Sequence, residues 1–269
     1  MALTHAAKET AKGGTQSLWR PPGIKEIWRQ PLPHLRLFDR ALTRACSVAA
    51  LPRFTSIAGL EHIAPERDPF ILALNHATRF EALALPALLV FHRRGKLVHF
   101  FADWNFQMIP GVGLLYRRSG AIVLTRKSAR PRILNALKPF YTHATSGMDR
   151  AKAHLAAGRS IAIFPEGTVN RDPARLLRGR LGAARLSLET GVPILPAGLR
   201  VTGGTSNSPF LSLVFGEALV PATAQTGGAA RVVSSSDVRD WHSVIMFEIA
   251  RLSGKSWQST RQEPRHGAQ

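Results

Sequence analysis

The sequence predicts an α/β protein with a mainly parallel mixed sheet covered by helices and preceded by a basic amphipathic helical segment. From residue 70 onward, short apolar runs typical of strands alternate with amphipathic stretches that have helical spacing. Several of the apolar runs lead directly into polar residues. The chain has 269 residues, which is enough for one large domain with a sizeable core.

The amino-terminal part is expected to differ from the rest. Residues 1–33 are polar, basic and proline-rich, so we expect a loosely ordered arm. Residues 34–52 have helical spacing with an apolar side formed by Leu37, Ala41, Ala45 and Val48. A second side carries Arg36, Arg40 and Arg44. Such a helix can lie in a membrane interface, or it can pack on its own domain with its arginines in water.

We therefore expect a basic arm and interfacial helix over 1–52, one domain over 53–252 and a flexible tail over 253–269. The predicted strands are 70–75, 97–102, 121–125, 160–164, 193–199 and 211–216. The predicted helices are about 80–93, 147–157, 180–190 and 236–252. Gly158 and Gly191 suit the ends of two of these helices. The Gly/Ser/Thr/Ala-rich stretches 203–209 and 221–235 are expected to be loops.

The charge predicts an anionic partner. The chain has 36 Lys+Arg and 17 Asp+Glu, a net charge of +19, and 30 of the basic residues lie in 1–200. Nucleic acid or a membrane rich in acidic lipid would suit this balance. No helix-turn-helix, aromatic RNA-binding signature or zinc spacing accompanies it, so we expect a membrane and no nucleic acid. A merely solvated set of arginines is the alternative.

The cysteine content and the hydropathy further narrow the class of protein. Cys46 is the single cysteine, which excludes an internal disulfide and a cysteine-based metal site. The longest apolar stretch, Ala82–Phe91, has 10 residues, about half of what a spanning helix needs. The amino terminus does not have the order of a signal peptide. We expect a peripheral protein on the cytoplasmic face of a membrane.

A histidine and a carboxylate follow the first apolar run of the domain. His76 comes directly after Phe70–Asn75, and Glu81 lies five residues further on. Residues five apart do not share a face of a regular helix. The pair can meet only if His76 sits in the turn and Glu81 in the first helical turn. One imidazole nitrogen would then bind the carboxylate, and the other could act as a general base. A hydrogen-bonded structural histidine is the alternative.

Two further runs end in polar residues. Phe164–Thr168 combines a strand end, a proline, Glu166 and Gly167, and glycine lets backbone amides approach an anion closely. Its alternative is a plain turn with an exposed glutamate. Arg126 closes the run 120–126. Because ligands of parallel sheets bind at the carboxyl ends of strands, we expect His76, Arg126 and Glu166 on one edge. The arginines that follow Thr168 favour an anionic ligand.

Four blocks in this order resemble the PlsC-like glycerophospholipid acyltransferases, of the 1-acylglycerol-3-phosphate acyltransferase type. The resemblance covers about residues 70–200. The blocks contain Asn75 with His76 and Glu81, then Gly120 to Arg126, Phe164–Thr168, and Val192–Pro196. The family usually has aspartate at the position of Glu81. The longer side chain keeps the charge but requires a shift of the helix or of the rotamer.

The resemblance implies a mechanism and a set of partners. His76 is implied to be the general base and Glu81 the residue that orients it. Asn75, Arg126, Glu166, Gly167 and Thr168 are implied to bind the acceptor lysolipid. The donor would be acyl-CoA or acyl carrier protein, with no metal or other cofactor. The favoured acceptor is 1-acyl-sn-glycerol-3-phosphate, which would give phosphatidate. Another lysolipid, such as lyso-ornithine lipid, and a non-catalytic basic membrane-binding protein on the same fold are the alternatives.

Overall fold

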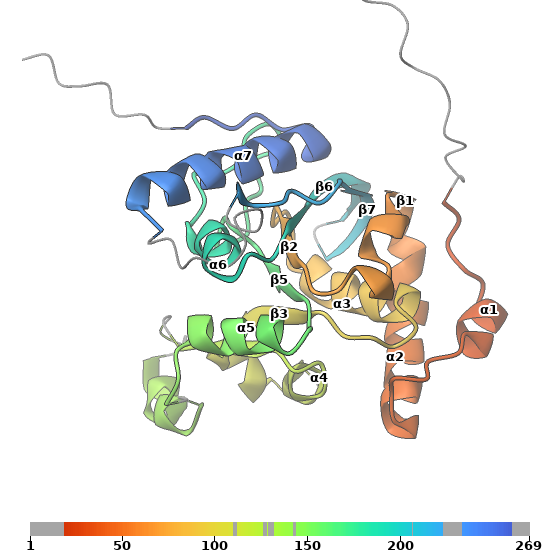
Figure 1. Cartoon of the computed structure of the whole chain (residues 1–269). Coiled ribbons are helices and arrows are strands. Elements are labelled where there is room, and N and C mark those ends of the chain that lie inside the picture. The colour runs from red at the N-terminus through yellow and green to blue at the C-terminus, as the bar shows by residue number, and fades with distance from the viewer. Residues whose placement is uncertain are drawn as a thin grey trace, which may run out of the picture.

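The computed structural model describes residues 19–109, 112–125, 128, 132–141, 144–205, 207–222 and 233–259. These residues form a seven-stranded sheet with the order β1-β7-β6-β2-β5-β3-β4 (Figure 1). Neighbouring strands are parallel except for β6 and β7, which are antiparallel. The predicted mainly parallel mixed sheet is confirmed.

Six of the seven strands in the described chain were predicted from the sequence, and one was not. Their bounds are β1 Phe54–Ala58, β2 Ile71–Leu74, β3 His99–Asp103, β4 Ile122–Leu124, β5 Ile161–Ile163, β6 Ile194–Thr205 and β7 Ser208–Phe215. Strand β1 was not predicted. The prediction of a loop over 203–209 is wrong, since Gly203 and Gly204 lie inside β6 next to a register shift. Glycine inside a strand commonly marks such a bulge.

The predicted helices are confirmed to within a few residues. The α-helices are α1 Ile24–Arg29, α2 Leu37–Ala50, α3 Glu81–His92, α4 Val112–Arg118, α5 Gly147–Ala156, α6 Gly182–Thr190 and α7 Ser235–Ser253. The 3-10 helices are η1 Leu51–Arg53, η2 Leu60–Ile63, η3 Pro65–Arg67, η4 Trp104–Met108 and η5 Arg132–Tyr141. Helices α1, α4, η4 and η5 were not predicted. Most of the predicted loop 221–235 lies outside the described residues.

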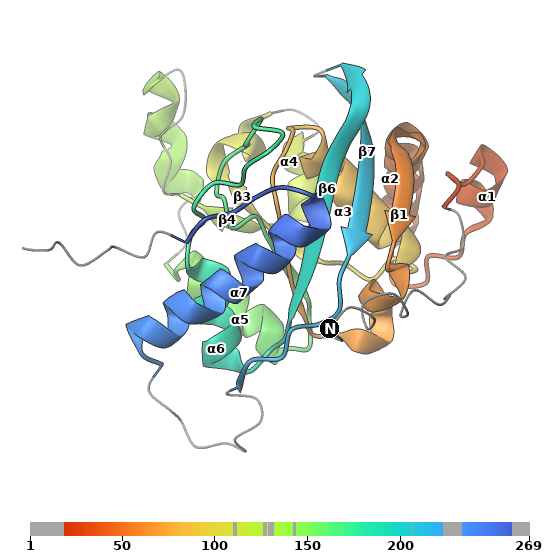
Figure 2. The same ribbon diagram turned by 90° about the horizontal axis from the view of Figure 1, so that it is seen from above.

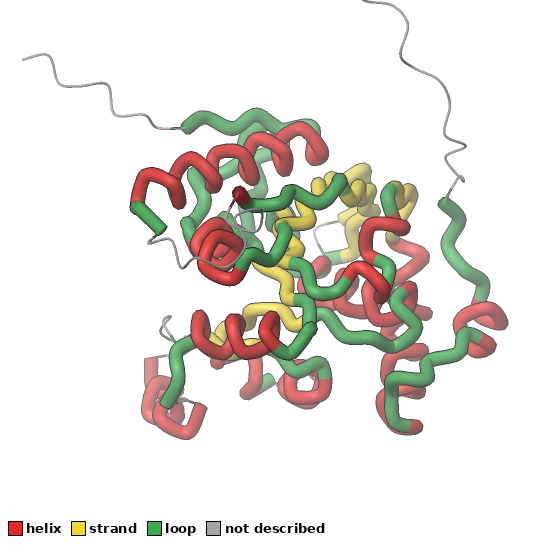
Figure 3. The backbone as a smooth tube through the Cα atoms, in the orientation of Figure 1, coloured by secondary structure: helices red, strands yellow, loops and turns green. Residues whose placement is uncertain are grey.

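Helices cover both faces of the sheet, as Figures 1 and 3 show. Strand β2 is buried on both sides, and its side chains alternate between two cores. Leu72 and Leu74 pack in the core shared with α2 and α3. Ile71 and Ala73 pack in the core shared with α5, α6 and α7. In the described part of the chain, no helix combines the length and apolar composition needed to cross a bilayer.

The two ends of the described chain are more ordered than the sequence suggested. Residues 24–29 were predicted to belong to a loose arm, but they form α1, and Ile27 is buried in the core against α2 and α3. Trp257 was predicted to lie in a flexible tail, but it is also buried and its indole donates to the Arg178 carbonyl oxygen. In both cases a buried aromatic or aliphatic side chain fixes the segment. Residues 1–18 and 260–269 lie outside the described residues.

Helix α2 packs on α3, but not through the side that its apolar pattern singled out. Leu37, Ala41 and Ala45 are exposed, and of the predicted apolar side only Val48 packs on the core, whereas Ser47 and Ala50 are buried. Arg40 donates to the Leu35 carbonyl oxygen and Arg44 to that of Gln30. The helix therefore packs on its own domain, with Arg40 and Arg44 bonded to the backbone rather than in water. Contact of its exposed apolar residues with a membrane remains a prediction.

A buried ion pair fixes the amino ends of the central strands. The Arg93 guanidinium, at the end of α3, donates to both carboxylate oxygens of Asp68 at 2.8 and 2.7 Å. It also donates to the Ile63 carbonyl oxygen at 2.6 Å. Ser160, just before β5, donates to the same Asp68 carboxylate. Removing one partner of such a pair is destabilising, because it leaves a buried charge uncompensated. The opposite, carboxyl ends of the strands are left for the site.

His92 makes the stability of the fold sensitive to acid. Its ring lies 5.3 Å from the rings of both Trp19 and Phe91, and burial lowers its pKa from 6.5 to about 4. Between these two pH values the unfolded chain binds more protons than the folded one. The free energy of unfolding therefore falls as the pH falls through this window, and this contribution is fully lost below about pH 4.

Replacing His92 by phenylalanine should remove at most about 3 kcal/mol of this acid sensitivity. Urea unfolding at about pH 7 and about pH 4.5 measures it as the difference between the two free energies. His34→Phe is the matched control, because His34 is exposed. Equal acid destabilisation of the two variants would contradict the assignment to His92.

Candidate active site

The site lies where β2 ends, and the backbone there is held from two sides. The Asn75 side chain is buried and exchanges two hydrogen bonds with the Leu199 backbone of β6, at 2.8 and 2.9 Å. The His76 N–H donates to Glu166 Oε2 at 2.9 Å, and its carbonyl oxygen accepts from the Asn170 N–H at 2.7 Å. His76 is therefore fixed between the neighbouring strands before its side chain makes any contact.

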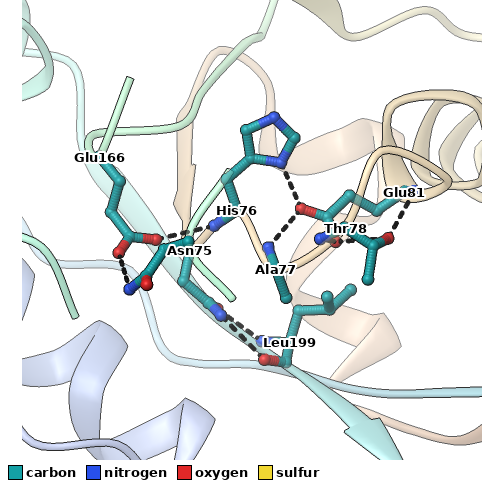
Figure 4. Close-up of polar contacts among 8 residues, drawn as sticks. Asn75, His76, Ala77, Thr78, Glu81, Glu166 and Leu199 are labelled. Carbon is teal, nitrogen blue, oxygen red and sulfur yellow. Dashed lines mark hydrogen bonds and ion pairs between the residues drawn. The ribbon is translucent and has the colours of Figure 1, made fainter. Parts of the chain in front are cut away.

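The imidazole of His76 has a defined orientation (Figure 4). Its Nδ1 lies 2.5 Å from Glu81 Oε1. A carboxylate oxygen only accepts, so Nδ1 carries the proton, and Nε2 points away from Glu81 with its lone pair available. The ring stacks on Phe164, with centroids 4.3 Å apart and planes inclined by 23°. The side chain of His76 is 17% exposed and that of Glu81 is fully buried. This is the arrangement that a general base requires.

Glu81 can reach His76 because its longer side chain bends back over the turn. Its Oε1 also accepts from the Ala77 N–H at 2.7 Å, and its Oε2 accepts from the Thr78 N–H at 2.9 Å. The Thr78 hydroxyl lies 3.3 Å from Oε2 and 3.4 Å from the Glu81 nitrogen. These reciprocal bonds have the pattern of a capping box. The predicted geometry, a base in the turn against an acid in the first helical turn, is thus the one observed.

Glu166 lies behind His76 rather than in the open part of the site. Its carboxylate is buried, and Oε1 accepts from the Asn170 side chain at 2.7 Å and from the Leu177 N–H at 2.8 Å. With the bond from His76 to Oε2, both oxygens are used inside the protein. In this geometry Glu166 supports His76, and its predicted contact with an acceptor lipid remains a prediction. Neither Asn170 nor Phe164 had been assigned a role from the sequence.

Gly167 and Thr168 lie at the surface of the same loop. Gly167 has a left-handed backbone with φ of 67°, and a Cβ there would lie 2.7 Å from Arg180 Nε. The Arg180 guanidinium therefore covers Gly167, and the Arg180 backbone N–H donates to the Pro165 carbonyl oxygen at 2.7 Å. Thr168 and Arg180 are both exposed. Sequence reasoning had listed Arg180 only as one of several arginines after Thr168. The Arg180 guanidinium therefore lies over Gly167, the residue that directly follows Glu166.

The predicted edge of the sheet is confirmed for two of its three residues. His76 and Glu166 follow the paired parallel strands β2 and β5, and they meet. Arg126 lies outside the described residues. Among the residues that the structure describes, no group of three His, Cys, Asp or Glu side chains could hold a metal ion. The independence of the reaction from metals remains a prediction.

A small apolar pocket lies beside the amino-terminal half of α3. It is lined from α2 by Leu42 and Cys46, from α3 by Leu83 and Ala87, and from α4 by Leu115. Leu83 lies two residues after Glu81, so the pocket lies along the helix that orients the base. Burial raises the pKa of the Cys46 thiol, which favours a neutral apolar lining.

Known proteins resemble this chain in sequence and in fold. A chloroplast 1-acyl-sn-glycerol-3-phosphate acyltransferase of Brassica napus is 27% identical over 64% of this chain and 47% of its own length. A lyso-ornithine lipid O-acyltransferase of Pseudomonas aeruginosa is 30% identical over 59% of this chain and 51% of its own. The chain thus spans about half the length of these curated relatives. The crystal structure of PlsC from Thermotoga maritima aligns with 88% of this chain and with 81% of its own chain. The TM-score is 0.50 and the sequence identity is 20%, so the two proteins share a fold.

The family model described as Acyltransferase matches residues 56–200, which is more than half of the chain and includes His76, Glu81, Glu166 and the residues that contact them. The four blocks identified in the sequence lie in the same range. With the matching fold, these findings show that the chain belongs to the acyltransferase family of PlsC-like proteins.

Proposed function

We propose that the protein transfers a fatty acyl group from acyl-CoA or acyl carrier protein to the hydroxyl of a lysophospholipid. The favoured acceptor is 1-acyl-sn-glycerol-3-phosphate, and the product is then phosphatidate. The observation that carries the proposal is the His76 imidazole, held through Nδ1 by the buried Glu81 and open at Nε2. Family membership and the activities named for the relatives support it.

In this proposal the acceptor hydroxyl gives its proton to His76 Nε2 as its oxygen attacks the thioester carbonyl carbon. Glu81 stabilises the imidazolium that forms, since it already accepts the Nδ1 proton. The carbon–sulfur bond then breaks, and the sulfur takes the proton from Nε2 and leaves as a thiol. The pocket beside α3 is where we place the acyl chain, because most of its lining is apolar and its two charged residues, Asp39 and Arg118, are paired with each other. Each step uses groups of this chain and its two substrates.

The acceptor headgroup needs a cation on the same edge. We propose that Arg180 and Arg126 bind its phosphate, with Gly167 and Thr168 beside it. Arg180 is exposed, and no described carboxylate pairs with it. Its guanidinium covers Gly167, three residues from the Phe164 ring that stacks on His76. Arginine suits a phosphate because its planar fork donates two parallel hydrogen bonds.

A lyso-aminolipid is the second candidate acceptor, favoured by the relative from Pseudomonas aeruginosa at 30% identity. It would use the same base and donor but would place a different headgroup near Arg180. A non-catalytic binding protein is disfavoured, since the His76–Glu81 geometry is intact. A panel of lysolipids with labelled acyl-CoA and acyl carrier protein, with products identified by mass, decides among the acceptors and donors.

We also propose that the protein works as a peripheral protein on the cytoplasmic face of a membrane, with no nucleic acid as partner. Both the acceptor and the product are membrane lipids. The net charge of +19 favours anionic lipid. The exposed apolar side of α2, formed by Leu37, Ala41 and Ala45, supports contact with the interface.

His76→Ala should lower kcat by about 10²–10⁴-fold, because the hydroxyl loses its general base. Acyl transfer from labelled acyl-CoA measures the loss under initial-rate conditions. His62→Ala is the matched control, since His62 lies in η2, near the amino end of β2 and away from the site. Wild-type activity of the His76→Ala variant would refute the proposed mechanism.

Arg180→Gln and Arg126→Ala should each raise KM for lysophosphatidate by about tenfold or more, through loss of a charged hydrogen bond. The effect on an acceptor without phosphate should be much smaller. Arg185→Gln on α6 is the control, because its side chain is exposed outside the loop. Unchanged lysophosphatidate kinetics in either variant would remove that arginine from the phosphate site.

Glu166→Gln should lower kcat with less effect on KM, since Glu166 holds the His76 backbone rather than the acceptor. Glutamine would place an amide NH₂ where a carboxylate oxygen now accepts a hydrogen bond, so one buried donor would face another donor. The free energy of unfolding should fall by about 1–3 kcal/mol. Kinetics and urea unfolding measure the two effects, with the exposed Glu61→Gln as control. A large rise in KM with unchanged kcat would instead assign Glu166 to the acceptor.

A further inference from the structure

Exposed apolar side chains gather around α4 and the two 3-10 helices that flank it. We call this set the apolar ridge and define it by Phe38, Phe106, Ile109, Leu114, Ile133 and Phe140. All six are exposed, and Ile133 and Phe140 are 80% and 83% exposed. Single exposed apolar residues are ordinary, but a contiguous group of large ones marks an interaction site.

Side-chain contacts connect α2, α4 and η4 within the ridge. Arg118 at the end of α4 bonds Asp39 of α2 at 3.0 Å and lies 5.0 Å from the Phe38 ring. Tyr116 packs edge-on against Phe106 with centroids 6.1 Å apart. Figures 1 and 2 agree that α4 lies between α2 and the helical segment that precedes α5. Leu134 and Tyr141 of η5 pack in turn on Trp104 of η4, so the elements that carry the ridge are neighbours.

Helix η5 shows most clearly that this surface has no partner in the described chain. Leu134 and Tyr141 pack inward on the buried Trp104, while Ile133 and Phe140 project from the same helix into solvent. None of the residues of η5 is buried. One side of η5 is thus covered by the protein, and the other leaves large apolar side chains in water at an unfavourable free energy.

The charge around the ridge is mostly positive, although Asp103 precedes η4 and lies near Tyr116. The segments 36–40, 104–118 and 132–141 contain five arginines and one lysine. Their single carboxylate, Asp39, is already paired with Arg118. Arg36, Arg117 and Arg132 are exposed. Aromatic and aliphatic side chains flanked by exposed arginines are the composition of a surface that lies in an anionic membrane interface.

The ridge also lies at the correct edge of the sheet. Strand β3 runs directly into η4, which leads to α4, and β4 ends shortly before η5. These are carboxyl ends of strands parallel to β2 and β5, whose own carboxyl ends carry His76 and Glu166. A bilayer that contacts the ridge would therefore face the edge at which the base is exposed.

We propose that the apolar ridge inserts into the interface of a bilayer rich in anionic lipid and brings the site to its lipid substrate. The role given to the ridge, bringing the site to lipid, rests on the proposed function. The test of the ridge does not, because it measures vesicle binding without catalysis. The membrane contact then lies on η4, α4 and η5 as well as on α2. Contact through α2 alone would leave the orientation of the edge open, whereas contact through α2, α4 and η5 together defines it.

Vesicle sedimentation with the full chain and no lysolipid tests the ridge separately from catalysis. With phosphatidylglycerol-rich vesicles, Ile133→Ser combined with Phe140→Ser should weaken partitioning by at least about tenfold. Val244→Ser combined with Phe247→Ser is the matched control, since both residues are exposed on α7. Arg132→Gln should reduce binding to anionic vesicles and leave the weak binding to neutral phosphatidylcholine unchanged.

The outcomes separate the alternatives. Wild-type partitioning of the ridge variant, or equal losses in the ridge and control variants, would overturn the inference. So would a dimer in vesicle-free buffer that the ridge variant converts to a monomer, because a second copy would then cover the ridge. Acyl transfer to lysolipid presented in detergent micelles should be unchanged in the ridge variant. If all variants lack transfer but the ridge variant alone loses vesicle binding, the proposed function fails and the ridge stands.

Discussion

The orientation of His76 depends on a carboxylate that lies behind it. Glu166 accepts from the His76 N–H through one oxygen and from Asn170 and Leu177 through the other. This side chain therefore joins the end of β2, the loop after β5 and the segment that leads to α6. It can span them because β2 and β5 are parallel neighbours that end at the same edge. The bond from the Asn170 N–H to His76 and the stacking of Phe164 on the imidazole both depend on this loop position.

Two buried carboxylates thus serve one histidine in different ways. Glu81 contacts the His76 ring and sets its tautomer, whereas Glu166 contacts only the backbone N–H of His76. A buried carboxylate is costly unless hydrogen-bond donors surround it. The donors to Glu81 are the His76 ring and the Ala77 and Thr78 N–H groups, all within five residues of it. Glu81 is therefore stabilised by the turn that it shapes, while the donors to Glu166 come from separate segments. The first arrangement is local, and the second exists only when the whole sheet has formed.

That difference explains how much of the molecule could be predicted from its sequence. Apolar runs, helical spacing and helix-ending glycines placed six strands and five helices, and the spacing of His76 and Glu81 allowed one local geometry that the structure confirms. The inward direction of Glu166 could not be predicted, since its three donors are distant in sequence or lie across the loop. The position of Arg180 over Gly167 could not be predicted either, since it depends on the left-handed backbone of Gly167, which the sequence does not specify. Strand β1 lacks a regular alternation and is held by its pairing with β7. Helix η5 does have apolar residues at helical spacing, at Ile133, Leu134, Leu137 and Phe140, so here the sequence carried a signal that the prediction did not use.

The basic composition acquires a meaning only once the structure shows which arginines are occupied. Arg40, Arg44 and Arg93 donate to backbone carbonyl oxygens, and Arg118 is paired with Asp39. The total charge therefore overstates the cationic surface, and it cannot by itself distinguish nucleic acid from lipid. The neighbours of the remaining cations do distinguish them. Nucleic-acid surfaces set aromatic rings as stacking platforms along a basic groove. Here the exposed arginines flank aliphatic and aromatic side chains that project from η5 into solvent. That combination fits a lipid interface, into which apolar side chains can be buried while the guanidinium groups stay at the headgroups.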